Sequence, residues 1–168
     1  YTDIKLTSVR KVIAKSMHMS LSTMAQLTLN SSFDATKLLE LRASLKERAE
    51  KLGMPNITLN DMILFAVSRT LGAHPDLNAH YLEEQGVMRR FTSVNLGIAV
   101  DTERGLLVPT LFGAEKLTLS ELSVKAKEII TAAQKGSIAP DLLRGASFTV
   151  TNLGSLGIES FTPVINPP

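Results

Sequence analysis

Residues 94–111 read VNLGIAVDTERGLLVPTL, two β-rich apolar runs joined by a polar turn. The runs, 94–100 and 106–111, are rich in Val, Ile and Leu. Short apolar runs bounded by turn residues predict a pair of strands. A third run, 147–151, predicts another strand that leads into the corner Asn152-Leu153-Gly154. We expect these strands to form the centre of the fold.

Helical patterns surround these strands. In each pattern, apolar residues recur at spacings of three and four, which predicts a helix with one apolar face. Side chains suited to capping precede three of the patterns. The predicted helices span 9–24 behind Ser8, 35–52 with Asp34 as N-cap, 58–71 with a capping box at Thr58 and Asp61, and 118–134 with a capping box at Thr118 and Glu121.

Further extended segments complete the expected fold. Residues 79–82 and 87–91 flank the turn Glu83-Glu84-Gln85-Gly86 and predict a hairpin. Residues 26–34 alternate loosely and predict a strand, and 161–165 predict one more extended piece. Because helices and strands mix without a strict βαβ rhythm, the sequence favours an α+β fold with a mixed sheet.

Composition narrows the class of protein. The 168 residues fit one domain, and the absence of cysteine excludes disulfides and thiolate zinc sites. A net charge of +2 is too weak to indicate nucleic-acid binding. The apolar runs fall far short of the roughly 20 residues that a membrane span needs. These features favour a soluble domain of a reducing compartment.

Chemical signatures are sparse. His18, His74 and His80 lie apart, and none has a companion at the spacing of a metal site or catalytic triad, so no metal is expected. Hydroxyl and amide side chains at Thr151 and Asn152 could donate hydrogen bonds to a ligand oxygen or an oxyanion. The alternative is that they satisfy backbone groups of a turn.

Seven motifs follow one another along the chain: RKVIAKSM (10–17), TLND (58–61), HPDLNA (74–79), VNLGIAVDT (94–102), GLLVP (105–109), SFTVTNLG (147–154) and VINPP (164–168). In this order and spacing they resemble the catalytic domain of the 2-oxo acid dehydrogenase acyltransferases, the lipoate-bearing E2 components. The similarity covers essentially the whole chain.

The resemblance implies a fold like chloramphenicol acetyltransferase, a mixed sheet with flanking helices, in homotrimers that build 24- or 60-subunit cores. It implies transfer of an acyl group between dihydrolipoamide and coenzyme A, with lipoate carried on a separate lipoyl domain. E1 and E3 components are the implied partners, and nucleic acid and membrane are not. The implied location is the bacterial cytoplasm or the mitochondrial matrix.

The sequence departs from this family in one respect. The family's general base lies in a His-x-x-x-Asp-Gly motif beyond the Asn-Pro-Pro segment, and the sequence to Pro168 contains no such motif. Residues 1–168 are therefore expected to be a C-terminally truncated catalytic domain, incomplete in fold and inactive alone. The alternative is a non-catalytic oligomeric scaffold or binding module derived from that fold.

The resemblance also assigns site residues. Thr151 matches the family's oxyanion-stabilising hydroxyl, and Arg10 matches a helix position that steadies the Asp of the missing motif. Residues 24–29 resemble acetyl-transferring members. For Arg42 the alternative is a solvated helix cation, and for Thr58 a plain N-cap. The residues matched to coenzyme A binding are Arg42, Thr58, Asp101 and Asn152.

Overall fold

A three-stranded sheet lies at the centre of residues 34–152, the larger of two compact units in the computed structural model. The smaller unit combines residues 1–33 with the C-terminal residues from Leu153 onward. The structure describes residues 1–103 and 105–165.

The central strand β3 (Leu96–Ile98) pairs on one side with β6 (Thr110–Leu111) and on the other with β7 (Phe148–Val150). The β3–β6 pair is antiparallel and the β3–β7 pair is parallel, with Gly97 opposite both Thr110 and Thr149. The prediction of a mixed sheet in an α+β fold is therefore confirmed.

The two runs within residues 94–111 do pair, but each divides into two strands. The inner parts, β4 (Val100–Thr102) and β5 (Gly105–Leu107), form a separate antiparallel hairpin. The outer parts are β3 and β6. Thus one predicted pair of strands becomes two shorter ladders.

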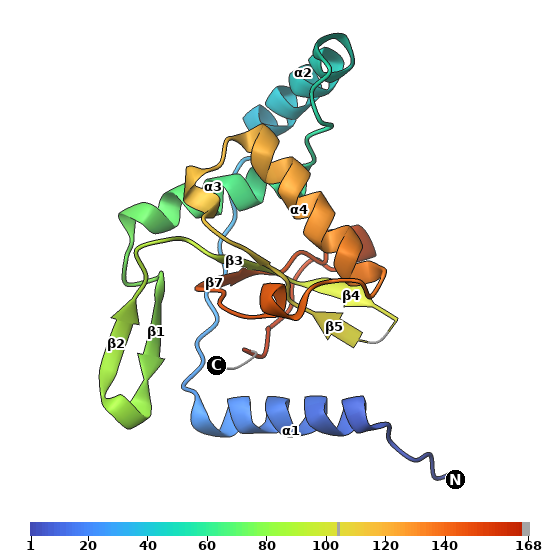
Figure 1. The fold of residues 1–168 in the computed structure, drawn as a ribbon, viewed down its shortest axis with the longest axis vertical. Helices are drawn as coiled ribbons and strands as arrows, with labels where there is room; N and C mark the ends of the chain where they lie inside the picture. Colours follow the sequence, from blue (N-terminus) through green and yellow to red (C-terminus); the bar gives the residue numbers. More distant parts are fainter. Residues whose placement is uncertain (104, 166–168) are drawn as a thin grey trace. The chain divides into compact units, whose positions relative to one another are not determined.

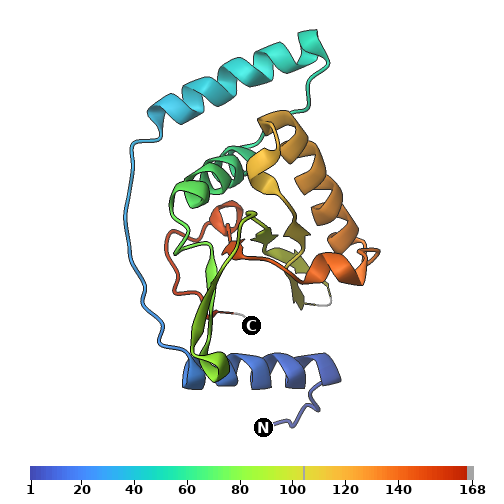
Figure 2. The same ribbon diagram turned by 60° about the vertical axis from the view of Figure 1, so that its left-hand side comes forward.

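Two helices, α3 (Leu59–Ala73) and α4 (Leu119–Gln134), lie on the same side of this sheet (Figures 1 and 2). Both begin at the capping boxes that the sequence predicted. Because side chains alternate along a strand, one face of β3 meets the helices and the other carries Gly97. The core between sheet and helices includes Leu64, Leu71, Leu96, Ile98, Leu111, Leu122 and Ala126.

Gly97 allows close approach on the face opposite the helices. A Cβ at this position would lie 2.9 Å from Thr149 Oγ1, 3.0 Å from Val108 Cγ1 and 3.1 Å from the Ala146 Cβ. Such distances are shorter than ordinary van der Waals contact. Glycine is therefore the residue that lets β7 and the Val108 side chain pack together here.

A buried polar network holds the parallel pair at its amino end. The Ser147 N–H donates to the Asn95 carbonyl at 2.8 Å, and the Asn95 N–H donates to Ser147 Oγ at 3.0 Å. Ser147 Oγ in turn donates to Asn78 Oδ1 at 2.5 Å. The Asn78 amide donates to the carbonyls of Phe91 and Ser93. Three segments distant in sequence are thereby joined.

The Glu115 carboxylate extends this network. It accepts hydrogen bonds from Ser93 Oγ at 3.0 Å and from the Val94 N–H at 2.9 Å. Burial opposes ionisation of Glu115, but these hydrogen bonds outweigh it and hold the pKa of the carboxyl below its ordinary value of 4.5. Arg69 of α3 donates to the carbonyls of Glu115 and Leu117, which attaches the helix to the same loop.

Helix α2 (Thr36–Leu52) and the hairpin of β1 (Ala79–Leu82) and β2 (Val87–Arg90) also belong to the larger unit. The two strands pair antiparallel, as the sequence predicted. Helix α2 lies beyond α3, away from the sheet (Figure 1). Its N-cap is Ala35 rather than Asp34, and Asp34 Oδ1 accepts hydrogen bonds from the N–H and Oγ1 of Thr36.

In the smaller unit, α1 (Ser8–Thr23) is capped by the Thr7 side chain, which accepts from the Arg10 N–H. Ser20, fully buried, donates through Oγ to the Ile165 carbonyl at 2.5 Å and accepts from Gln26 Nε2 at 3.0 Å. The end of α1 is thereby attached to the C-terminal segment. Among the described helices, none combines the length and apolar character that crossing a membrane requires.

The strand predicted at 26–34 is wrong, and 161–165 forms no strand. The segment 26–34 does carry alternating apolar side chains, and Leu27, Leu29 and Phe33 are 84%, 85% and 73% exposed. A strand exists only through ladder hydrogen bonds to a neighbour, and within the described residues no ladder includes this segment.

The close packing at Gly97 predicts that Gly97→Ala lowers the free energy of unfolding by about 1–3 kcal/mol, as overpacking typically does. Urea denaturation of the purified chain measures this. Gly72→Ala in α3 is the matched control, because nothing lies within 4 Å of its added Cβ and alanine favours the helix. Equal destabilisation by both variants would contradict the packing argument.

The lowered pKa of Glu115 predicts a pH-dependent effect of Glu115→Gln. The ionised carboxylate adds stability above its ordinary pKa of 4.5, and this contribution is lost as the pH falls through the lower folded pKa. The variant should therefore unfold at a lower temperature at neutral pH, with the difference shrinking in acid. Thermal unfolding between about pH 3 and pH 7 checks this, with the exposed Glu128→Gln as control. A difference that grew in acid would refute it.

Candidate functional site at the carboxyl edge of the parallel strands

The parallel pairing of β3 and β7 brings predicted site residues to one edge of the sheet. Thr151 and Asn152 follow β7 directly, and Asp101 lies in β4, which continues the chain from β3. The carboxyl ends of parallel strands meet at the same edge, where α/β proteins commonly bind ligands. All three residues are exposed there.

The first turn of α3 lies beside this edge. Asn152 Nδ2 donates to Asn60 Oδ1 at 3.2 Å, although the two residues are 92 positions apart. Thr58, the N-cap of the same turn, is thereby brought near Asn152. Its Oγ1 accepts from the Asp61 N–H at 3.1 Å, so the N-cap interpretation of Thr58 is confirmed. A hydroxyl that accepts this bond can still donate its own hydrogen to a ligand.

A buried cluster fixes the first turn of α3 to α4. Asp61 Oδ2 accepts from the Thr58 N–H at 2.8 Å and from Ser123 Oγ of α4 at 2.9 Å. Lys127 Nζ donates to Ser123 Oγ at 2.9 Å, lies 3.6 Å from Asp61 Oδ2 and also donates to the Asn56 carbonyl. Charged and neutral partners together satisfy the buried carboxylate.

Arg42 and Arg10 lie on other elements, the helices α2 and α1. Arg42 is half-buried on α2, and its Nε is buried with no hydrogen-bond partner in the described part of the chain. Arg10 is exposed on α1, and its backbone N–H donates to Thr7 Oγ1. Within the described ranges, neither guanidinium forms a salt bridge.

The chemistry available at the edge is hydrogen bonding by neutral groups. The hydroxyl of Thr151 and the amide of Asn152 can donate to a carbonyl oxygen or to the oxyanion that forms from it. The three histidines belong to other positions: His18 is on α1, His74 caps the carboxyl end of α3, opposite to the Thr58 end, and the His80 ring meets the Phe91 ring edge-on at 4.6 Å. Across residues 1–103 and 105–165, no group of three or more His, Asp or Glu is placed to hold a metal ion.

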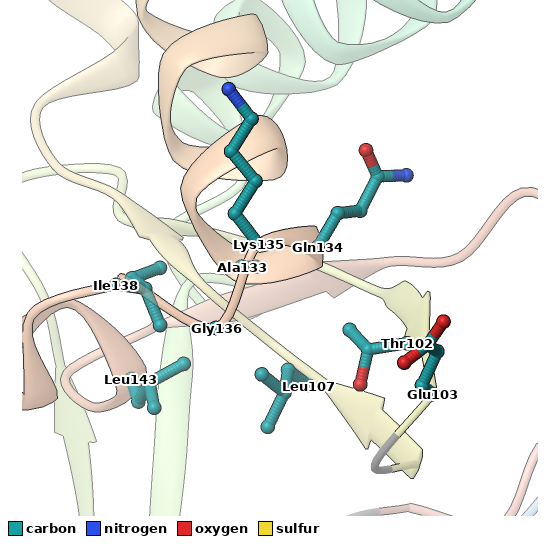
Figure 3. A pocket seen from close by; sticks show the side chains of 9 residues that line it. All are labelled: Thr102, Glu103, Leu107, Ala133, Gln134, Lys135, Gly136, Ile138 and Leu143. Carbon is teal, nitrogen blue, oxygen red and sulfur yellow. The ribbon is translucent and has the colours of Figure 1, made fainter.

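A hollow of about 320 Å³ lies elsewhere, under the last turn of α4. Figure 3 shows Leu107, Ile138 and Leu143 gathered below that turn, while Gln134 and Lys135 point away from them. A second hollow of about 370 Å³ is lined by residues near the Asn78 network. Neither is lined by Thr58, Thr151 or Asn152, so both are separate from the candidate site.

The sequence interpretation missed Asn60, Ser123 and Lys127. Asn60 lies inside the capping box TLND, but nothing local indicates its contact with Asn152. Ser123 and Lys127 are spaced four apart on α4, which places them on one helix face. That spacing was the available signal, yet it does not identify Asp61 as their common partner.

Comparison with solved structures assigns this α+β domain to the class of acyltransferase catalytic cores. A structure of dihydrolipoamide acetyltransferase from Azotobacter vinelandii, determined to investigate a serine, a histidine and an asparagine in its catalytic mechanism, matches with a TM-score of 0.91. It is 31% identical, over all of this chain and 69% of that one. The cubic core of the pyruvate dehydrogenase multienzyme complex matches with a TM-score of 0.91 and 30% identity, over 100% and 69% of the two chains.

The particular family follows from the sequence comparison. The model of the 2-oxoacid dehydrogenases acyltransferase (catalytic domain) matches residues 1–168. The dihydrolipoyllysine-residue acetyltransferase component of the acetoin cleaving system of Bacillus subtilis (strain 168) is 40% identical over 166 residues, 99% of this chain and 41% of that protein. The chain belongs to the 2-oxoacid dehydrogenase acyltransferase family. It spans less than half the length of the curated relatives it matches.

The buried cluster predicts that Ser123→Ala lowers the free energy of unfolding by about 1–3 kcal/mol, because the Asp61 carboxylate loses a buried donor. Urea denaturation measures this change. Ser120→Ala on the same helix is the matched control, since both substitutions change helix propensity alike. A loss no larger than that of the control would show that Asp61 does not depend on Ser123.

Proposed function

We propose that the protein carrying this chain transfers an acyl group between dihydrolipoamide and coenzyme A, as the core component of a 2-oxo acid dehydrogenase complex. The observation that carries this proposal is the placement of Thr151 and Asn152 beside the first turn of α3 in a domain of the acyltransferase family. Relatives named as dihydrolipoamide acetyltransferases support the reaction.

In the proposed mechanism, Thr151 stabilises charge that develops on the substrate. A thiol of dihydrolipoamide or coenzyme A gives its proton to a general base, and the resulting thiolate forms a C–S bond to the thioester carbonyl. The Thr151 hydroxyl donates to the tetrahedral oxyanion. Collapse breaks the other C–S bond, and the departing thiolate takes back the proton. The base is the family's motif histidine, which is not among these 168 residues.

Coenzyme A is proposed to bind as a substrate at the same edge. Asn152 and Thr58 would donate to amide and hydroxyl oxygens of its pantetheine arm or ribose, and Asp101 would accept from its hydroxyls. A guanidinium suits phosphate, so Arg42, half-buried on α2, is proposed to bind a phosphate of coenzyme A. Lipoate would arrive on a separate lipoyl domain.

The acyl group is proposed to be acetyl, because residues 24–29 resemble acetyl-transferring members and the matched relatives are named acetyltransferases. Self-assembly through trimers into a 24- or 60-subunit core is supported by the likeness to a cubic core. E1 and E3 components are the proposed partners. The proposed location is the bacterial cytoplasm or the mitochondrial matrix, since bacterial and mitochondrial relatives both match.

A non-catalytic scaffold is the second candidate function. It is favoured by the positions of His18, His74 and His80, none of which belongs to the elements that carry Thr151. An assay of acetyl transfer from acetyl-CoA to dihydrolipoamide separates the candidates. The full-length gene product should be active and the 168-residue chain inactive, whereas an inactive full-length protein would leave only the scaffold.

The oxyanion role predicts that Thr151→Val in the full-length protein lowers kcat by about 10²-fold or more, with KM for coenzyme A nearly unchanged. Valine matches the shape of threonine but lacks the donor, and the hydrogen bond strengthens as charge develops. Thr151→Ser is the control and should retain most activity. Near-full kcat in the valine variant would make Thr151 a turn residue, and a rise in KM alone would assign it to ground-state binding.

A further inference from the structure

We propose that Asn60 is a positioning residue for coenzyme A binding, acting through the side chain of Asn152. The inference rests on the proposed function, and it adds a residue that neither the motifs nor the family resemblance assigned. Its basis is the hydrogen bond from Asn152 Nδ2 to Asn60 Oδ1, the contact that joins the corner after β7 to α3.

Asn60 is the fixed partner of this pair. It lies in the first turn of α3, where the Thr58 N–H and hydroxyl both bond to Asp61. Asp61 is in turn held by Ser123 and Lys127 of α4. Because both ends of the capping box are occupied and its carboxylate is buried, the backbone of this turn has little freedom.

Asn152 is the partner that is proposed to contact the ligand. It is exposed and lies two residues beyond a strand of only three residues, so its backbone lies outside the β3–β7 ladder. An exposed side chain samples several rotamers, and a ligand that binds one of them must first bring the others to that state. The bond to Asn60 selects a rotamer before the ligand arrives.

The sense of this bond also sets the orientation of the Asn152 amide. Its nitrogen faces the Asn60 oxygen, so its Oδ1 is directed away from Asn60. An amide oxygen has two lone pairs, so it can accept from an amide N–H or a hydroxyl of a pantetheine chain in addition to a protein donor. Loss of the bond should weaken coenzyme A binding and leave the oxyanion contact of Thr151 intact.

A double-mutant cycle in the full-length gene product tests the proposal. Asn60→Ala, Asn152→Ala and the double variant are compared with wild type for kcat and for KM of coenzyme A. We expect Asn60→Ala to raise KM about three- to tenfold, the usual range for one hydrogen bond, with kcat within about twofold. In the Asn152→Ala background, the same substitution should change KM less than about twofold. Leu59→Ala, the adjacent exposed residue of the turn, is the matched control.

Two results would overturn the proposal: no rise in KM, or the same rise in both backgrounds, which would show that Asn60 acts independently of Asn152. A second cycle on thermal unfolding reads the contact without activity. The shift caused by Asn60→Ala should disappear when Asn152 is already alanine. If wild type transfers no acyl group, the proposed function fails, while the unfolding cycle still decides whether the two residues are coupled.

Discussion

The parallel pairing of β3 with β7 is the constraint on which the larger unit depends. It joins residues about 52 positions apart, and it needs the amino-end hydrogen bonds between Ser147 and Asn95 as well as a glycine at position 97. Pairing two segments this far apart in sequence costs more conformational entropy than forming contacts between near neighbours. Once formed, the pair sets the face that α3 and α4 cover and the edge at which Thr151 and Asn152 leave the sheet.

Local patterns in the sequence were sufficient to predict the helices. They were not sufficient to predict the contacts between elements that lie far apart in the chain. The capping boxes at Thr58 and Thr118 connect residues three apart, so they could be identified directly. The strand predicted at 26–34 was wrong. Alternating apolar residues indicate which way side chains would point in a strand, but they do not indicate whether a partner strand exists. The contact of Asn60 with Asn152 spans 92 positions and required the fold.

The candidate site consists of a buried, rigid part and an exposed part. Asp61, Ser123 and Lys127 are arranged to hold a helix start in place, and none of them is required to touch a ligand. Thr151 and Asn152 carry a hydroxyl and an amide on the segment that follows β7. Preorganised donors lower a barrier because their reorientation is completed before the reaction begins. The bond from Asn152 to Asn60 connects this segment to the fixed first turn of α3.

The bond from Ser20 to the Ile165 carbonyl has a consequence for the order of synthesis. Domains generally begin to fold while the ribosome is still extending the chain. Residues 34–152 contain the sheet, α3 and α4, and all of these elements have been made once Asn152 leaves the ribosome. Helix α1 precedes this unit in the chain, but Ile165, which accepts the bond from its Ser20, is made only after the unit. Helix α1 therefore completes its contacts after the sheet that follows it in the chain.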